Sequence, residues 1–352
     1  MKRYGNLWEK VISIENLKLA DRRARKRKTH SYGVRMHDKN REANIIALHE
    51  ALLTKTYRTS EYTVFTIHEP KERLIYRLPY YPDRIVHHAV MNVLEPIWVK
   101  TFTYNTYSCI KGRGISGCSR QVGKIIKSFD GGPLYCLKLD ITKFYPSINH
   151  DVAKILIRRK IKDKDLLWLL DEIIDSADGL PIGNYISQFV ANLYLCYFMH
   201  YANERLPYDV MEDLSLSEVP RLKGTEYADD IVFMADRKEV LRCAFTHLRE
   251  RVEALDLKVK GNHQIFPIAY NKQDNCGRAL DYVGYQSFRN QKLMRKSIKR
   301  NLCRAVARAN KLNLDEMEYR QRISSWLGWA KHSDSKHLVQ TLLKQNYYAN
   351  VS

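Results

Sequence analysis

Apolar residues along the chain recur at helical spacing in several long stretches. The spacing of three or four residues predicts helices wherever it persists for three or more turns. Asp83 is a suitable N-cap for one of them, and the pattern over 185–204 is amphipathic. The helices predicted in this way cover residues 41–56, 83–98, 152–177, 185–204, 237–255 and most of the chain from Arg289 onward.

Three other stretches have the pattern of strands. Residues 61–78 alternate between apolar and polar side chains and are predicted to be extended. Residues 133–140 form an apolar run that ends in Asp140. Residues 223–235 predict two short strands joined by Ala228, Asp229 and Asp230.

The net charge of the chain limits the classes of partner that it is expected to bind. The 352 residues include 59 Lys and Arg against 39 Asp and Glu, a net charge of +20, and 45% are hydrophobic. A folded chain this basic favours a polyanionic partner, nucleic acid before membrane. Ten of the first thirty residues are basic, and a solvated helix face explains them as well as RNA contact does.

Several patterns argue against a membrane or secreted protein. The longest apolar run, 182–199, is interrupted by polar residues, and the N-terminus shows no signal-peptide pattern. The seven cysteines contain no Cys-x-x-Cys pair. This favours the reducing cytoplasm over a disulfide framework and argues against a zinc site.

Acidic residues at strand ends are the candidate metal-binding and catalytic groups. Asp140 ends one apolar strand, and Asp229 and Asp230 occupy a turn between two others. Carboxylates gathered at a sheet edge repel one another unless a cation lies between them, and hard oxygens suit Mg²⁺, or Mn²⁺ in its place. Two such ions ~3.5–4 Å apart support in-line phosphoryl transfer. The alternative is that these are ordinary turn and strand-end acids.

A run of motifs around these acids resembles the reverse transcriptases. Tyr227-Ala-Asp-Asp230 is similar to their tyrosine-x-aspartate-aspartate box, and Asp140 to Tyr145 is similar to their first palm motif. Further similar segments occur in family order from about residue 70 to 290. They are Arg73-Leu-Ile-Tyr-Arg77, 82–86, Tyr107-Ser-Cys-Ile-Lys-Gly-Arg113, 180–188, 191–195, Leu257-Lys-Val-Lys260 and Asp281-Tyr-Val-Gly-Tyr285.

Two positions resemble one subfamily. Ile182 stands where most relatives have Gln, and Ser187-Gln188 stands where they have Ser-Pro. This combination is similar to the reverse transcriptases of diversity-generating retroelements, as are Ile265-Phe-Pro267 and Trp329-Ala-Lys-His332. The length leaves too little chain for a maturase and DNA-binding extension, and no appended endonuclease pattern follows residue 290.

The resemblance assigns roles to individual residues. Asp140 and Asp229 are expected to bind both of two Mg²⁺ ions, with Asp230 in support and Ile141 among the metal-binding positions. Tyr145 is expected to be the steric gate against a 2′-OH. The remaining nucleotide-binding candidates are Lys71, Arg73, Lys111, Arg113, Ile182, Gly183 and Gln188, and either Lys258 or Lys260 is the candidate general acid.

A basic stripe near the C-terminus is predicted from the residues themselves. Residues 289–311 hold nine basic residues and no acid, which favours phosphate contact over a solvated face. At helical spacing the stripe comprises Lys292, Lys296, Arg300, Arg304 and Arg308.

The resemblance implies an α+β right-hand polymerase fold with a palm built on an antiparallel sheet. The expected divisions are a basic helical extension (1–60), fingers (61–130), a palm (131–285, with a helical finger insertion at 151–178) and a basic helical thumb (286–352). The implied activity is RNA-directed DNA synthesis from deoxynucleoside triphosphates on a DNA or RNA primer. The implied role is copying a template-repeat RNA into adenine-mutagenised cDNA for mutagenic retrohoming, with a small basic accessory variability protein. The alternatives are a reverse transcriptase of another bacterial lineage (retron, defence-associated or CRISPR-linked) and a non-catalytic RNA-binding scaffold with a relic palm.

Overall fold

The computed structural model describes residues 2–68, 72–129, 131–312 and 314–347. Within these ranges helices are combined with three antiparallel sheets, so the predicted α+β class is confirmed. The chain forms two compact units that interleave along the sequence. Unit 1 comprises Met1–Cys109, Ile141–Tyr201 and Arg249–Val259, and unit 2 comprises Ile110–Asp140, Ala202–Leu248 and Lys260–Ser352. The predicted divisions into fingers, palm and thumb stay predictions.

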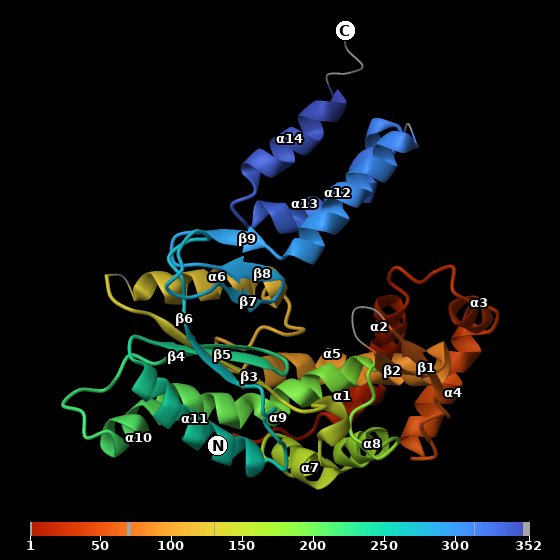
Figure 1. Cartoon of the computed structure of the whole chain (residues 1–352). Helices are drawn as coiled ribbons and strands as arrows, with labels where there is room; N and C mark the ends of the chain where they lie inside the picture. The colour runs from red at the N-terminus through yellow and green to blue at the C-terminus, as the bar shows by residue number, and fades with distance from the viewer. Residues whose placement is uncertain (1, 69–71, 130, 313, 348–352) are drawn as a thin grey trace. The chain divides into compact units, whose positions relative to one another are not determined.

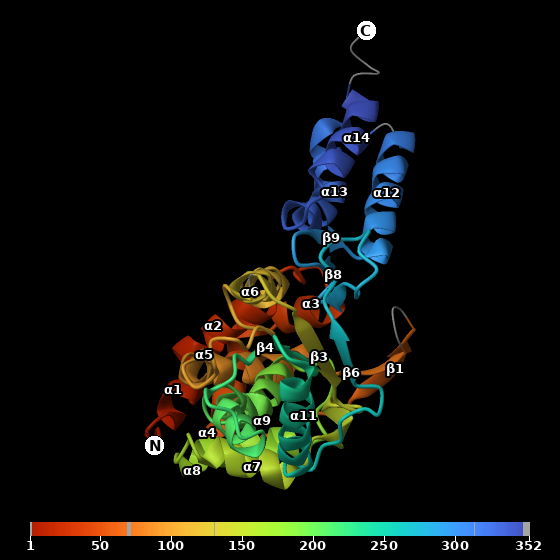
Figure 2. The same cartoon turned by 60° about the vertical axis from the view of Figure 1, so that its left-hand side comes forward.

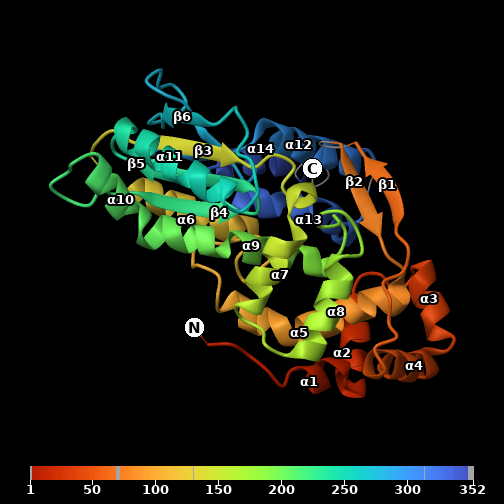
Figure 3. The same ribbon diagram turned by 90° about the horizontal axis from the view of Figure 1, so that it is seen from below.

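Unit 1 is mainly helical, with one two-stranded ribbon. The ribbon pairs β1 (Thr63–Ile67) with β2 (Arg73–Arg77), as the extended pattern over 61–78 predicts (Figure 3). The helices are α1 (Trp8–Ile12), α2 (Ile14–Ala24), α3 (Tyr32–Asp38), α4 (Arg41–Leu53), α5 (Ile85–Val99), α7 (His150–Arg158), α8 (Lys164–Ile174) and most of α9 (Tyr185–Glu204), with short turns η1 (Tyr80–Arg84) and η2 (Tyr145–Ser147).

A buried carboxylate joins the N-terminal helices of unit 1. Asp21 on α2 is fully buried. It accepts hydrogen bonds from Arg25 at 2.8 and 2.9 Å, from Arg41 at 2.7 Å and from the Tyr80 hydroxyl at 2.5 Å. Burial alone would raise the pKa of Asp21, but the hydrogen bonds from Tyr80, Arg25 and Arg41 together hold it below its ordinary value. The Asp21 cluster therefore fixes α2 against α4 and the turn that begins α5.

We expect Asp21→Ala to destabilise unit 1 by about 3–5 kcal/mol, because it leaves two guanidinium groups and a hydroxyl without their buried acceptor. The stabilisation is present above the ordinary aspartate pKa and is lost as pH falls through the lower folded-state pKa. Urea unfolding of both forms measures the difference. Glu42→Gln, which removes an exposed ion pair with Lys18, is the control. Equal unfolding midpoints for Asp21→Ala and Glu42→Gln would contradict the prediction.

Unit 2 contains the four-stranded sheet in the order β4-β5-β3-β6. β3 (Tyr135–Asp140) and β5 (Asp230–Ala235) are its central strands, and β4 (Lys223–Tyr227) and β6 (Gln264–Pro267) are its edges (Figure 1). Every residue of β5 from Ile231 to Ala235 is buried. This explains its continuous apolar sequence, since a strand covered on both faces has no polar side. The helices α6 (Gly114–Ser128), α10 (Leu206–Asp213) and most of α11 (Lys238–Glu253) complete this part.

The C-terminal part of unit 2 has its own core. A three-stranded sheet of β7 (Leu280–Tyr282), β8 (Tyr285–Ser287) and β9 (Lys292–Met294) precedes α12 (Lys296–Lys311), α13 (Glu316–Lys331) and α14 (Lys336–Tyr347). Figure 2 shows α12 and α13 side by side, and Leu302, Val306 and Ile323 are buried between them. A Cβ at Gly284, where φ is +84°, would lie 2.5 Å from the Trp329 ring, so this turn requires glycine.

Three predicted helices differ in the structure. The C-terminal helix begins at Lys296, because residues 292–294 pair with β8. The helix predicted over 152–177 is two helices, α7 and α8. Asp83 does not cap α5 but accepts hydrogen bonds from the Tyr57 hydroxyl and the Ser60 amide.

The helix predicted over 185–204 is confirmed as α9, but it is buried on nearly all sides and is not amphipathic. No helix among the described residues combines the length and apolar character needed to cross a bilayer.

Candidate active site

The strand register of unit 2 brings the predicted acids together. Asp140 on β3 lies directly opposite Asp230 on β5. Residues directly opposite in an antiparallel pair project to the same face of the sheet. The two carboxylates therefore share one end of one face, and Asp229 is adjacent to Asp230 in the chain.

Asp229 lies in a two-residue turn. Tyr227 on β4 pairs with Asp230 on β5, so only Ala228 and Asp229 join the strands. Ala228 has φ of +54°, a left-handed conformation that is strained for a residue other than glycine. The tight turn holds Asp229 beside the end of the sheet, as the hairpin pattern predicts.

Two lysines contact these carboxylates. Lys260 Nζ lies 2.6 Å from Asp140 Oδ2, and its backbone amide donates to the Asp140 carbonyl at 2.8 Å. Lys138 Nζ lies 3.4 Å from Asp230 Oδ1 and donates to the carbonyl of Asp281 at 2.9 Å. Lys138 was not predicted from the sequence, although its position two residues before Asp140 on a strand puts both on one face.

The surroundings of Asp230 disfavour its charged form. Burial raises the pKa of Asp230 to about 6; Lys138 opposes the shift, and the charges of Asp229 and Asp140 add to it. Its backbone carbonyl accepts a hydrogen bond from the Tyr282 hydroxyl at 2.8 Å. Asp230 is half-buried, and a cation beside it would offset the like charges of Asp140 and Asp229.

Several of the predicted nucleotide-binding residues lie in unit 1. The backbone carbonyl of Ile182 accepts a hydrogen bond from the Tyr76 amide of β2 at 2.8 Å. A Cβ at Gly183, where φ is +125°, would lie 2.5 Å from the Tyr76 carbonyl oxygen, so this close approach requires glycine. Arg73 is exposed on the same strand, β2. Tyr145 is half-buried, and its carbonyl accepts a hydrogen bond from the Leu180 amide at 2.8 Å.

A basic cavity of about 180 Å³ adjoins Gly183 and Gln188. Lys28, Arg84, His87 and His88 also line it. Burial lowers the pKa of His87 to about 3 and that of His88 to about 4, so both are neutral at pH 7. Burial and then the charges of Arg84 and Arg77 lower the pKa of Lys28. These clustered cations indicate affinity for an anion.

The cationic residues of this cavity were not assigned a role from the sequence. Lys28 ends the basic run over 22–28, and Arg84 lies in the motif over 82–86. A signal was therefore present in both segments, but nothing in the sequence pattern showed that they meet.

Residues 68–264, more than half of the chain, match the family described as "Reverse transcriptase (RNA-dependent DNA polymerase)". The chain belongs to the reverse transcriptase family. The matched range includes Asp140, Asp229, Asp230 and Lys260, and it ends before α12.

Two curated relatives share part of this reverse transcriptase region. Protein YkfC of Escherichia coli (strain K12) is 26% identical over 142 residues, covering 36% of this chain and 37% of that protein. Nuclear intron maturase 1, mitochondrial, of Arabidopsis thaliana is 25% identical over 100 residues, covering 28% of this chain and 14% of that protein. The match therefore spans well under two thirds of either relative.

The other predicted site residues of this reverse transcriptase chain are placed as follows. Lys111 is exposed and Arg113 precedes the first residue of α6, both in unit 2. Ile141 is buried, so only its backbone could bind a metal. Lys258 is exposed in unit 1, and its carbonyl accepts a hydrogen bond from the Thr142 amide. Lys71 lies outside the described residues.

Four of the five residues of the basic stripe share one helix, and their contact with nucleic acid stays a prediction. Lys296, Arg300, Arg304 and Arg308 are exposed on α12. Lys292 is on β9, where its Nζ lies 5.3 Å from the centre of the Tyr285 ring. It was wrongly placed in the helical stripe, because the strand pairing with β8 determines its conformation.

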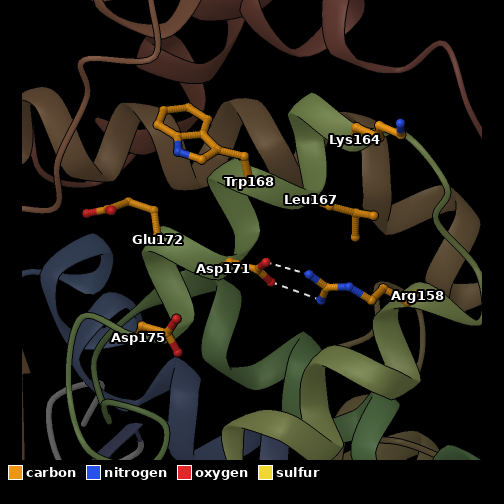
Figure 4. A pocket seen from close by; sticks show the side chains of 7 residues that line it. All are labelled: Arg158, Lys164, Leu167, Trp168, Asp171, Glu172 and Asp175. Atoms are coloured by element: carbon orange, nitrogen blue, oxygen red, sulfur yellow. Dashed lines mark hydrogen bonds and ion pairs between the residues drawn. The ribbon is translucent and has the colours of Figure 1, made fainter.

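A hollow of about 500 Å³ on α7 and α8 contains several acids but is not a catalytic candidate (Figure 4). Asp171 there is held by Arg158 at 2.5 and 3.0 Å. Asp175 is paired with Lys154 at 2.6 Å, and Glu172 accepts a hydrogen bond from the Thr59 amide at 3.1 Å. Because each of these acids is already held by a partner, we interpret their roles as structural.

Proposed function

We propose that the chain is an RNA-directed DNA polymerase whose catalytic acids are Asp140, Asp229 and Asp230. The observation that supports this most directly is the register that puts Asp140 opposite Asp230 beside the Asp229 turn. The strands β3 to β7 belong to the proposed palm (131–285), β1 and β2 belong to the proposed fingers (61–130), and β9 with α12 to α14 belongs to the proposed thumb (286–352) of a right-hand polymerase.

The acids fit a divalent cation. Their donors are hard carboxylate oxygens, which Mg²⁺ and Mn²⁺ prefer. The raised pKa of Asp230 indicates that its charged form lacks full compensation from Lys138. Asp140 and Asp229 would hold two ions, with Asp230 and the backbone of Ile141 in support. Bound there, the ions would polarise phosphoryl oxygens and lower the pKa of a primer hydroxyl.

Residues of this chain would orient the substrates. Gly183 and Ile182, fixed on β2 through Tyr76, would support the incoming deoxynucleotide, and Arg73, Lys71, Lys111 and Arg113 would bind its phosphates. Of the two candidate general acids we favour Lys260, because its ammonium already contacts Asp140. It would donate a proton to the leaving pyrophosphate.

We further propose a role in a diversity-generating retroelement, in the cytoplasm, with a small basic accessory protein. Ile182 and Gln188 support it, because both depart from the usual Gln and Pro of relatives. A second candidate is an intron-associated or other bacterial reverse transcriptase, which the partial similarity to an intron maturase favours.

Sequencing the cDNA made from a defined RNA template tests both proposals. Incorporation of deoxynucleotides that depends on RNA template, primer and Mg²⁺ supports polymerase activity. Errors concentrated opposite template adenines support the retroelement role. Errors spread evenly over the four bases would favour the second candidate, and no extension would contradict both.

Neutralising Lys296, Arg300, Arg304 and Arg308 together is expected to weaken binding to a template–primer duplex and flatten its salt dependence. These side chains are exposed on one helix without a nearby acid in sequence. Each lost phosphate contact should lower the log–log salt slope by about 0.7–0.9. Fluorescence anisotropy over a salt series measures the slope.

The single variant Arg304→Ala should lower this slope by the amount expected for one phosphate contact. Arg242→Ala, on α11, should leave the slope unchanged. A wild-type slope in the fourfold variant would mean that this face of α12 does not contact nucleic acid.

Ile182→Gln is expected to make synthesis more accurate opposite adenine, with little change opposite the other bases. The restriction to adenine is what the resemblance to diversity-generating retroelement enzymes implies, and the hydrogen-bond argument accounts only for the gain in accuracy. An amide side chain can hydrogen-bond near the nucleotide, whereas isoleucine only packs. An oriented hydrogen bond is worth about 0.5–1.5 kcal/mol, and correct pairs gain most from the added restraint. Single-nucleotide incorporation opposite each base measures the ratio of wrong to right insertion. An unchanged ratio opposite adenine would remove Ile182 from the origin of the errors.

A further inference from the structure

Two helices of unit 2 bring together three potential metal ligands that the polymerase reaction does not use. Cys243 and His247 are four residues apart on α11, so they lie on one face one turn apart. Asp213 is the last residue of α10. His247 Nε2 lies 2.8 Å from Asp213 Oδ2, Cys243 Sγ lies 3.5 Å from the same oxygen, and the three donor atoms all lie within 4.8 Å of one another.

We propose that Asp213, Cys243 and His247 form a binding site for Zn²⁺. Thiolate, imidazole and carboxylate are the ligands that zinc takes in proteins, at ~2.3, ~2.0 and ~2.1 Å. In a tetrahedron with these bond lengths the donor atoms are ~3.3–3.6 Å apart. Of the observed separations, 2.8 Å from Asp213 to His247 is shorter than this range, 3.5 Å from Asp213 to Cys243 lies within it, and the distance between Cys243 Sγ and the His247 nitrogen is at most 4.8 Å.

The chemistry of the donors selects zinc over the magnesium expected at the catalytic acids. Sulfur and imidazole nitrogen are soft or borderline ligands, whereas Mg²⁺ requires oxygen. Asp213 is partly exposed, and its side chain, like that of His247, is accessible to solvent. An ion can therefore enter, and three protein ligands leave a fourth position for water.

Local electrostatics also favour a cation. Asp213 is at the C-terminal end of α10, where the helix dipole disfavours a negative charge. A bound cation would neutralise the Asp213 carboxylate and remove this unfavourable interaction.

The competing explanation is a simple hydrogen bond that joins the two helices. Unit 1 contains such a pair without a thiol, His150 and Asp175 at 3.1 Å, and there Lys154 already neutralises the carboxylate at 2.6 Å. The His150–Asp175 pair is therefore a matched control within the same chain. Cys276, which is exposed, is the matched control for the thiol.

Cobalt titration of the purified full chain, after treatment with a chelator, tests the site. We expect one equivalent of Co²⁺ to bind with a thiolate-to-cobalt charge-transfer absorption, and Zn²⁺ to displace it. Co²⁺ at the catalytic acids gives no such band, because those donors are oxygens. Cys243→Ser and His247→Gln should abolish the band or weaken affinity at least about tenfold, while Cys276→Ser and His150→Gln should not.

Thermal unfolding gives a second measurement that does not depend on the cobalt absorption band. At free Zn²⁺ about 100 times its Kd, the ratio of folded to unfolded wild-type chain should rise about 100-fold. Asp213→Asn, which keeps the shape of the side chain, should lose this gain and still fold. Absence of the band in the wild type, its retention in Cys243→Ser, or equal stabilisation of Asp213→Asn by Zn²⁺ would each overturn the proposal.

Discussion

Asp140→Ala and Asp229→Ala are each expected to abolish primer extension, with a rate loss of at least about 10³-fold, while RNA binding persists. The two carboxylates lie at one end of the β3–β5 pair, where they would place the cations that stabilise the transferring phosphoryl group. Removing one preorganised electrostatic group from a catalytic site costs this much or more. RNA affinity is expected to depend instead on the cations of the cavity and of α12, and neither substitution removes any of these residues.

Primer extension on an RNA template, paired with a binding assay under the same conditions, measures both properties. Glu253→Ala, which removes an exposed acid from α11, should retain activity. Wild-type extension by either aspartate variant would contradict the assignment of the site. Loss of RNA binding together with activity would show that the variants had lost their fold.

Tyr145→Ala is expected to admit ribonucleotides, reducing discrimination against them by about 10- to 100-fold. Tyr145 begins η2 and is half-buried, held through its carbonyl by the amide of Leu180. A Cβ at Gly179 would lie 2.6 Å from the Pro146 carbonyl oxygen, so this segment packs tightly against the turn. A rigid ring at this position would fill the space that a 2′-OH needs, and the loss of such a steric contact has an effect of this size.

Tyr145→Phe is the matched control, because it keeps the ring and removes only the hydroxyl. It should discriminate as the wild type does. The ratio of kcat/KM for deoxy- and ribonucleotides measures the effect in all three forms. Unchanged discrimination in Tyr145→Ala would mean that another residue is the gate, and a loss in Tyr145→Phe would assign the effect to the hydroxyl.

Local patterns predicted the elements that hold the candidate acids. The two apolar runs over 223–235 around a short polar turn specify the β4–β5 hairpin, because a two-residue link leaves one antiparallel pairing. Asp140 at the end of an apolar run was likewise placed at the end of β3. The motifs in family order then led to the reverse transcriptase family, which the match over 68–264 confirms.

Local sequence patterns did not predict the short strands or the contacts of buried polar side chains. Lys292 has helical spacing to Lys296, yet cross-strand hydrogen bonds to β8 hold it in a strand. Asp83 resembles an N-cap, yet it is buried and accepts hydrogen bonds from Tyr57 and Ser60, more than twenty residues away in the chain. In both cases partners distant in sequence outweigh the local preference.

The sequence by itself determined the strands that hold the candidate acids, the hairpin that places Asp229, and the family. Only the tertiary structure decided which charges meet. It placed Lys260 on Asp140, Lys138 on Asp230 and Asp213 beside Cys243 and His247. The physical reason is that hydrophobic periodicity depends on near neighbours in the chain, whereas an ion pair depends on distances that strand register and helix packing set across 30 to 120 residues.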